Sequence, residues 1–320
     1  MAAQATGIAG VGQATGSASG TAATGASRVT TTQIGNTFGA RVDGIDARQL
    51  RPGDAEAVVA ALDRYGVIVM PRQSLDPIEQ IYFSETFGPL ERSSEGIPSL
   101  DQFARTERLK DPRLSEITNL TDEREVMVSS DARRLYQYAN RLWHTDSTFR
   151  PIRARYTYLR ANQVPGEGGE TEFADMVAAY EALPASMQRR LEGLMGVHTL
   201  NSAMDMLGAT REDSGGFKTS YEPQVRPIVD VHPNTGKKVL VVPSHCSHIE
   251  GLPIPEGRSL LFHLRELATQ REFVYRHRWT VGDMVIWDNR QTLHRAVYWD
   301  DDNKGRQMVR TLTQDVAARV

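Results

Sequence analysis

The sequence predicts a mainly β fold with α-helices packed outside it, arranged as a barrel or jelly roll. The first observation is a series of short segments rich in β-branched and aromatic residues, separated by turn residues at close spacing. The second is a smaller number of amphipathic helical patterns between them. The third is a length of 320 residues without an internal repeat, which is compatible with one large domain.

The N-terminal segment has the composition of a disordered tail. Ala, Gly, Ser and Thr make up 22 of the first 27 residues, so this segment has too little apolar surface to repay the entropy of ordering. It also lacks the positive start and continuous apolar core of a secretory signal. We therefore expect a disordered low-complexity tail over residues 1–30 and a single folded domain over residues 31–320.

The elements of the first third alternate between strands and helices. Residues 38–42 and the continuous apolar run 67–71 are typical of strands. A helical pattern begins at Asp54 and ends before Gly66, and a second begins near Pro77 and ends at Gly88. Residues 91–114 are polar and irregular, which favours a lid or a substrate-binding segment, and we expect residues 91–140 to line the pocket.

Strand patterns dominate from residue 115 onward. Helices are expected to begin at Asp175, at Pro184 and at Pro255, the last ending near Thr269. A turn at residues 233–236 joins two of the strands. The expected strands cover residues 116–120, 142–149, 154–159, 171–173, 225–231, 239–242, 273–279, 284–287 and 308–314.

Composition narrows the class of protein. The chain is 40% hydrophobic and 24% charged, as in ordinary globular proteins. A net charge of -3 gives no reason to expect a nucleic-acid partner or a membrane surface, and no apolar run is long enough to span a bilayer. Cys246 is the only cysteine, so no intrachain disulfide can form and a cytoplasmic location is expected.

The most informative motif is Trp143-His144-Thr145-Asp146. If this segment is a strand, His144 and Asp146 project from the same face. An imidazole and a carboxylate on one face are two of the three ligands that hold non-haem Fe(II) while leaving coordination positions open. His294 is the candidate for the third ligand. The alternative is that His144 is a core histidine and His294 a surface one.

Further segments add to this motif and together resemble one family. They are Asp288-Asn289 ahead of His294, the following Arg306, and residues 168–176, 249–253 and 268–279. With the His-x-Asp motif, these resemble the Fe(II)/2-oxoglutarate-dependent dioxygenases of the taurine and 2,4-dichlorophenoxyacetate group, over residues 31–316. The 2,4-dichlorophenoxyacetate branch is the more similar. The resemblance implies a double-stranded β-helix, which is a cupin-like jelly roll.

The resemblance also implies roles for individual residues. His144, Asp146 and His294 match the iron ligands, and Trp143, Phe149 and Trp287 would exclude water around them. Arg306 and Thr171 match the pair that binds the distal carboxylate of 2-oxoglutarate; Arg306 lies one position later than usual, which implies an insertion within residues 300–304.

Three residues are candidates for substrate binding. Arg310 matches an arginine that faces the substrate anion, and His245 and His248 have the spacing of two histidines in the more similar branch. An arginine is suited to this task because its guanidinium grips a carboxylate through two hydrogen bonds. From the residues alone, Thr171 could instead be an ordinary β-branched strand residue, and Arg310 could be a solvated arginine at a strand edge.

The function that the resemblance implies is oxidation of a small anionic organic substrate with Fe(II), 2-oxoglutarate and O2. An aryloxyacetate-like acid would give a phenol and glyoxylate, together with succinate and CO2. A taurine or alkylsulfonate substrate is the alternative within this chemistry. Outside it stand a non-catalytic jelly-roll binding protein and a metal-dependent hydrolase or isomerase. Relatives commonly associate into homo-oligomers, but no pattern in this sequence marks an interface.

Overall fold

Seven strands form the main sheet of the structure, a computed structural model that describes residues 29–93, 95, 109–208 and 221–316. Neighbouring strands are antiparallel except for the pair β2 and β3, which is parallel. In spatial order the strands are β1 (Thr30–Gln33), β2 (Ala40–Asp43), β3 (Val67–Met70), β13 (Met284–Asp288), β5 (Ala154–Gln163), β15 (Gln307–Gln314) and β4 (Ser115–Thr118).

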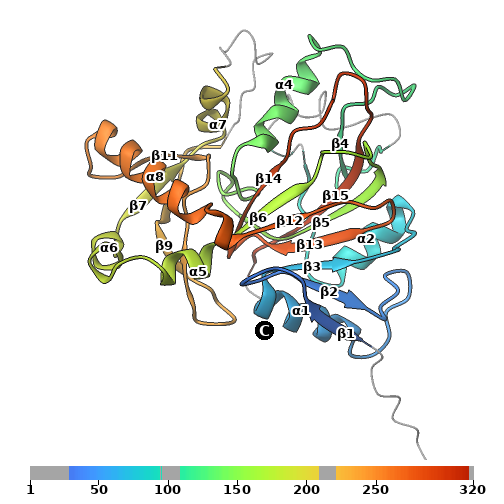
Figure 1. Cartoon of the computed structure of the whole chain (residues 1–320), viewed down its shortest axis with the longest axis horizontal. Helices are drawn as coiled ribbons and strands as arrows, with labels where there is room; N and C mark the ends of the chain where they lie inside the picture. Colours follow the sequence, from blue (N-terminus) through green and yellow to red (C-terminus); the bar gives the residue numbers. More distant parts are fainter. Residues whose placement is uncertain (1–28, 94, 96–108, 209–220, 317–320) are drawn as a thin grey trace, which may run out of the picture.

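A three-stranded antiparallel sheet packs against one face of the main sheet (Figure 1). Phe173 of this smaller sheet lies in the same buried cluster as Val285 and Trp287 of β13. Its strands are β12 (Val274–His277), β6 (Thr171–Asp175) and β14 (Thr292–Ala296). Two further antiparallel sheets are β11 (Cys246–Ile249), β7 (Met195–His198) and β8 (Gln224–Pro227), and β10 (Lys238–Leu240) with β9 (Val229–Val231).

Helices cover the outer surfaces of these sheets. Met284 and Ile286 alternate with the inward residues of β13 and therefore pack outward, in one cluster with Leu62 of the first helix. The helices are α1 (Asp54–Tyr65), α2 (Pro77–Glu85), α4 (Ala132–Tyr138), α5 (Met176–Glu181), α6 (Ala185–Leu191), α7 (Leu200–Met206) and α8 (Ile254–Ala268), with 3-10 turns η1 (Ala139–Arg141) and η2 (Arg271–Phe273). Figure 1 shows α5, α6 and α8 together on the side of the molecule away from α2.

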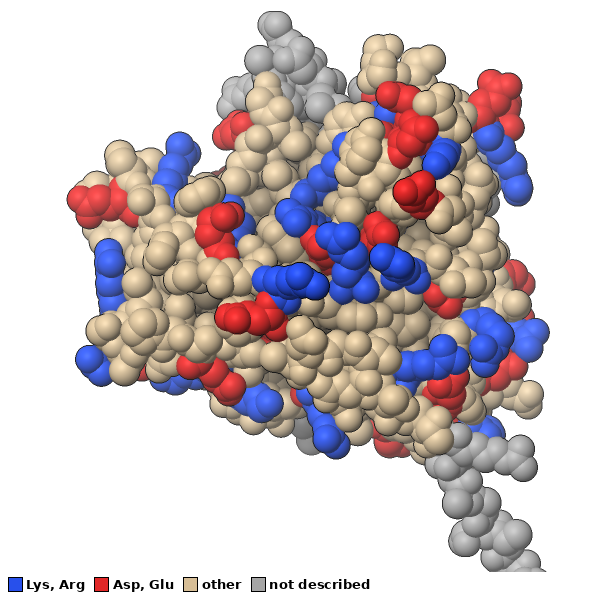
Figure 2. Space-filling model, in the orientation of Figure 1, with Lys and Arg blue, Asp and Glu red and all other residues tan. Residues whose placement is uncertain are grey.

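The outward face of the smaller sheet carries paired charges. Glu172 on β6 lies beside Arg276 on β12 and Arg295 on β14, and it accepts hydrogen bonds from both guanidinium groups. Figure 2 shows acidic and basic side chains intermingled on this side of the molecule. The alternate residues on β6 and β14, Thr171 and His294, project to the opposite, buried face, where the candidate site lies.

The described elements agree with most of the expected ones. Helix α1 ends at Gly66 as expected, α2 begins at Pro77 with a capping box between Asp76 and Glu79, and Asp175 caps α5. The expected strand 225–231 is instead two strands, β8 and β9. Strand β14, which carries His294, was not among the expected strands, because its residues Thr292 to Ala296 contain no continuous apolar run. The expected combination of β-structure with flanking helices is confirmed, and the described strands form several mostly antiparallel sheets.

The expected strand over residues 142–149 is wrong. Only His144 pairs there, in an isolated bridge with His294, and the chain then turns. The reason lies at Ser147, whose φ of 58° is left-handed and cannot continue a strand. Arg150 closes the turn by donating its backbone N–H to the carbonyl of Ser147 at 3.0 Å. Asp146 is therefore positioned by a turn, not by alternation along a strand.

Two expectations lie mostly outside the described residues. The predicted tail is one, since the description starts at Val29 and β1 at Thr30. The predicted lid is the other, since only residues 91–93, 95 and 109–114 of it are described. Within the described part of the chain, no helix has both the length and the apolar character needed to cross a membrane.

Candidate active site

Three buried side chains converge where the segment after η1 meets β14. The backbone N–H of His144 donates to the carbonyl of His294 at 3.0 Å, and the reverse bond is 2.7 Å long. Asp146 follows at the turn, and the ligand atoms of the three side chains all lie within 4.8 Å of one another. His144 Nδ1 is 2.8 Å from the carbonyl of Leu142, which fixes this nitrogen as the protonated one and leaves Nε2 as a ligand atom.

The protonation states of these groups suit a metal ion. Burial lowers the pKa of both His144 and His294, so both imidazoles are neutral. Burial alone would raise the pKa of Asp146, but the nearby Arg310 guanidinium and a hydrogen bond from Thr157 lower it to about 2. His294 Nδ1 is buried without a hydrogen-bond partner, and its Nε2 lies 3.7 Å from Asp146 Oδ2, beyond hydrogen-bond distance. Two neutral imidazoles and one carboxylate form a donor set that fits Fe(II).

A cleft adjoins the two histidines and is lined by Thr171, Arg306 and Arg310. The hydroxyl of Thr171 accepts a hydrogen bond from Trp279 Nε1 at 3.0 Å. Because an indole N–H can only donate, the hydroxyl proton of Thr171 is free to be donated to a ligand. Arg306 Nε donates to the carbonyl of Gly169 at 3.2 Å, and the Trp299 ring lies 5.5 Å from the guanidinium.

Arg306 is a buried cation without a carboxylate partner among the described residues. Only 3% of it is exposed, and burial lowers its pKa to about 10. Its backbone is fixed, since Asn119 accepts from its N–H at 2.8 Å and also holds the carbonyls of Asp301 and Lys304. The loop in which the sequence implied an insertion is thus anchored. A buried, fixed cation of this kind is an anion-binding site.

A second cleft also borders His144 and Asp146. Its charged lining includes Glu91, Arg150 and Arg310, and Arg150 Nε lies 3.3 Å from Glu91 Oε1. Burial raises the pKa of Glu91, and its Oε2 is buried without a hydrogen-bond partner. The rest of the lining is Ser93, Ala139, Asn140, His144, Asp146, Ser147, Phe149, Leu200 and His245.

The candidate substrate residues are placed differently from one another. Arg310 lines both clefts; its Nη1 lies 3.1 Å from Asp146 Oδ1 and its Nε donates to Ser115 Oγ at 3.0 Å. His245 lines the second cleft, with its ring 4.8 Å from that of Phe149. His248 lies outside the lining of both clefts, on β11, with Nδ1 2.9 Å from Ser247 Oγ.

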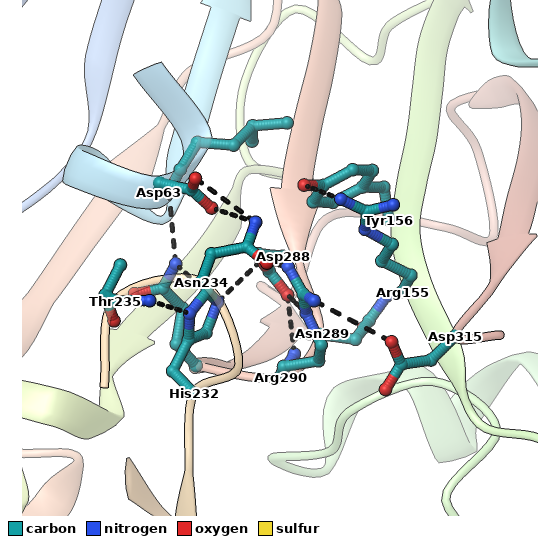
Figure 3. Close-up of polar contacts among 12 residues, drawn as sticks. Asp63, Arg155, Tyr156, His232, Asn234, Thr235, Asp288, Asn289, Arg290 and Asp315 are labelled. Carbon is teal, nitrogen blue, oxygen red and sulfur yellow. Dashed lines mark hydrogen bonds and ion pairs between the residues drawn. The ribbon is translucent and has the colours of Figure 1, made fainter. Parts of the chain in front are cut away.

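A second group with possible ligand atoms, Asp63, His232 and Asp288, is not suited to a metal ion (Figure 3). Arg290 binds the carboxylate of Asp288 through Nε at 2.8 Å and Nη2 at 2.6 Å. His232 Nε2 lies 3.0 Å from the same carboxylate. The acceptor atoms are therefore already used, and a guanidinium stands where a second cation would be repelled.

The comparisons with known proteins agree with this geometry. The model of the family described as "Taurine catabolism dioxygenase TauD, TfdA family" matches residues 30–312. The chain belongs to this family.

Relatives in the TauD, TfdA family match over most of their length. An alpha-ketoglutarate-dependent 2,4-dichlorophenoxyacetate dioxygenase of Cupriavidus pinatubonensis is 43% identical, covering 88% of this chain and 96% of the relative. An (S)-phenoxypropionate/alpha-ketoglutarate-dioxygenase of Sphingobium herbicidovorans is 34% identical, covering 84% and 89%. The crystal structure of AAD-2 in complex with Mn(II) and N-oxalylglycine is 34% identical, with a TM-score of 0.78, covering 91% of this chain and 98% of that one.

Membership of the TauD, TfdA family makes this chain a 2-oxoglutarate-dependent dioxygenase that uses Fe(II). Glu91 and Asn140, which line the second cleft, lie within the range 91–140 that was expected to line the pocket, whereas sequence reasoning did not find Arg150. Glu91 and Arg150 are 59 positions apart, so no local spacing could have paired them. Asn289, which lies next to Asp288 behind the site, could be noticed in the sequence because it belongs to the Asp288-Asn289 motif.

Proposed function

We propose that this enzyme oxidises a small monocarboxylic acid of the aryloxyacetate kind, giving a phenol, glyoxylate, succinate and CO2. His144, Asp146 and His294 would hold Fe(II). Thr171 and Arg306 would hold the distal carboxylate of 2-oxoglutarate, and the substrate would occupy the second cleft against Arg310 and His245. When bound, Fe(II) and 2-oxoglutarate supply the activation of O2 that oxidises a C–H bond.

The observation that carries this proposal is the unpaired Arg306 beside the three converging side chains. A buried guanidinium without a carboxylate stores an unfavourable desolvation energy, which a dicarboxylate ligand would relieve. Thr171, whose hydroxyl proton is free to be donated, lines the same cleft. A ligand carboxylate would therefore meet a guanidinium fork and a hydroxyl donor together.

The protein's own contribution to the reaction is placement and exclusion of water. The buried ring of Trp287 lies 4.6 Å from that of His294, and Phe149 lines the second cleft, so apolar rings border the candidate metal ligands. Trp143 does not take the expected part in this, because its ring packs against Arg295 on the outward face of the smaller sheet. The substrate C–H bond that is oxidised is the one that the cleft places nearest to the metal. For an aryloxyacetate, hydroxylation beside the ether oxygen gives a hemiacetal, which collapses to a phenol and glyoxylate.

The buried charges favour a substrate with a single negative charge. Glu91 and Arg150 form one ion pair, and Asp146 and Arg310 form another. With Fe(II), Arg306 and the two carboxylates of 2-oxoglutarate added, one positive charge remains in excess. Because an uncompensated buried charge is costly, the site favours one further anionic group.

The proposal also covers the fold, the domain organisation, the cellular location and the self-association of the protein. The packed sheets would form a double-stranded β-helix, and residues 31–320 a single catalytic domain after a tail. A cytoplasmic location is compatible with the buried free thiol of Cys246. Self-association into a homo-oligomer belongs to the same proposal, and light scattering from the purified chain would measure it.

The proposal predicts a strong dependence on substrate charge. Phenoxyacetate should support succinate formation with a kcat/KM at least roughly 100-fold above that of neutral phenoxyethanol or dianionic phenoxymalonate, because a site built for one carboxylate leaves charges unmatched otherwise. Ethanesulfonate tests the alkylsulfonate alternative, which has the same charge. A higher kcat/KM for the sulfonate than for any aryloxyacetate would replace the proposed substrate class.

Substitution of Arg310 separates the substrate site from the 2-oxoglutarate site. Arg310→Gln should raise the KM for phenoxyacetate by at least roughly 10-fold and leave the KM for 2-oxoglutarate nearly unchanged, since a charged hydrogen bond is lost at one ligand only. Steady-state kinetics with each compound varied in turn measures both constants. Equal increases in the two constants would show that Arg310 does not act mainly on the substrate.

A further inference from the structure

The Asp288-Asn289 pair lies at the turn between β13 and β14, and neither residue belongs to the proposed ligand sets. Asn289 is 7% exposed. Its Oδ1 accepts hydrogen bonds from the backbone N–H of Asp146 and from Trp287 Nε1, both at 3.1 Å. The hydroxyl of Thr145 contacts Asn289 as well, donating to its backbone carbonyl at 2.8 Å. One asparagine thus holds both the segment that carries Asp146 and a ring beside the site.

The direction of these hydrogen bonds is fixed by their donors. A backbone N–H and an indole N–H can only donate, so the atom of Asn289 that faces them must be the oxygen. Asn289 Nδ2 consequently points to Thr157 Oγ1, at 2.8 Å. The Thr157 oxygen accepts this bond and directs its own proton to Asp146 Oδ2, at 2.7 Å. The result is a chain of two hydrogen bonds donated in the same direction, from Asn289 to Thr157 and from Thr157 to Asp146, which we call the relay.

The relay starts from a rigid base, drawn in Figure 3. The Asp288 carboxylate is fully buried and is bound by Arg290 and His232. His232 Nδ1 accepts from the backbone N–H of Thr235 at 3.3 Å, so Nε2 carries the proton donated to Asp288. The backbone N–H of Asp288 donates to the carbonyl of Gly66 at 2.9 Å. The turn that carries Asn289 is therefore anchored to α1, to the β9–β10 hairpin and to its own arginine.

We propose that Asn289 and Thr157 are positioning residues that fix the carboxylate of Asp146 for metal binding. Thr157, which is fully buried on β5, holds Oδ2, while Arg310 contacts Oδ1 at 3.1 Å. Hydrogen bonds on both oxygens set the rotation of the carboxylate plane before a metal ion arrives. Without the Thr157 bond the carboxylate can rotate, and metal binding must restrict that motion. This inference rests on the proposed metal site.

Thr157→Val tests the relay, because valine keeps the shape of threonine and removes only the hydroxyl. The dissociation constant for Mn(II) should rise by roughly 10- to 100-fold, the usual effect of losing an outer partner of a metal ligand. The electron paramagnetic resonance signal of free Mn(II) during titration of the purified full chain measures it directly. Thr157→Ser keeps the hydroxyl and should restore the dissociation constant to within a few-fold of the original.

Thr311→Val is the matched control. Thr311 is also fully buried, and its hydroxyl bonds to Ser84 Oγ at 2.6 Å, away from the three ligands. Thr311→Val should bind Mn(II) like the unsubstituted chain. If Thr157→Val does not fold, as judged by circular dichroism, Thr157→Ala provides the same loss of the hydroxyl without β-branched crowding.

Two results would overturn the inference, and they differ from failure of the metal site itself. Unchanged Mn(II) binding by Thr157→Val, or equal weakening by Thr157→Val and Thr157→Ser, would mean that the hydroxyl does not position Asp146. If the unsubstituted chain did not bind Mn(II) at all, the proposed metal site would be wrong, and this inference would fall with it.

Discussion

Replacing His144 with alanine is expected to abolish 2-oxoglutarate turnover. His144 and His294 are paired through their backbones, and within the described part of the chain their imidazoles and the Asp146 carboxylate form the group of possible ligand atoms at this place. Loss of one of three ligands should weaken Mn(II) binding by more than the roughly 10- to 100-fold that loss of an outer partner causes. Titration with Mn(II), followed by an assay for succinate with Fe(II), measures both effects.

An exposed histidine provides the control for this substitution. His263 lies on the exposed face of α8, so His263→Ala should leave metal binding and turnover unchanged. Because removal of a buried imidazole can also affect folding, the thermal unfolding of metal-free His144→Ala should be compared with that of the metal-free original chain. Full activity of a folded His144→Ala chain would refute the assignment of His144 as a ligand.

Replacing Arg306 with methionine should remove the response to 2-oxoglutarate while leaving the ligand-free fold intact. Arg306 is a buried cation without a carboxylate partner in the described structure, so an apolar side chain of similar length removes a desolvation cost. The ligand-free variant should therefore be at least as stable as the original chain. Its affinity for 2-oxoglutarate should fall by about 2–5 kcal/mol, which is roughly 30-fold or more.

Thermal unfolding in the presence of Mn(II) separates these two effects. Saturating 2-oxoglutarate should raise the Tm of the original chain, because a ligand that binds only the folded state stabilises it, and should have little effect on Arg306→Met. Arg48→Met is the control, since Arg48 is half exposed and its ion pair is with Asp46, far along the sequence from the candidate site. An equal rise in Tm for Arg306→Met and the original chain would place the 2-oxoglutarate carboxylate elsewhere.

Local patterns predicted those elements whose stability is local. Helix α2 has its cap, its proline and its capping box within a few residues of one another, and β3 is a continuous apolar run. The same reasoning gave a wrong prediction for the segment around Asp146. Its apolar and β-prone residues favour a strand, but contacts from Asn289 and the left-handed Ser147 make it a turn. Tertiary contacts thus override the local preference.

The residues of the candidate site also differ in whether the sequence could predict them. His144, Asp146 and His294 could be named from the sequence because they belong to a recognisable motif, and the structure brings their ligand atoms together. Thr157 is an ordinary strand residue in the sequence, and its position becomes informative only when β5 pairs with β13. Long-range packing alone creates such contacts, and a single sequence carries no sign of them.

The most direct test of the proposed reaction is product formation by anaerobically iron-loaded protein supplied with 2-oxoglutarate, O2 and phenoxyacetate. The proposal predicts that succinate appears only when phenoxyacetate is present and that phenol accumulates in equal amount. Succinate formed at the same rate with or without the acid, or no succinate from protein that has bound iron, would contradict it.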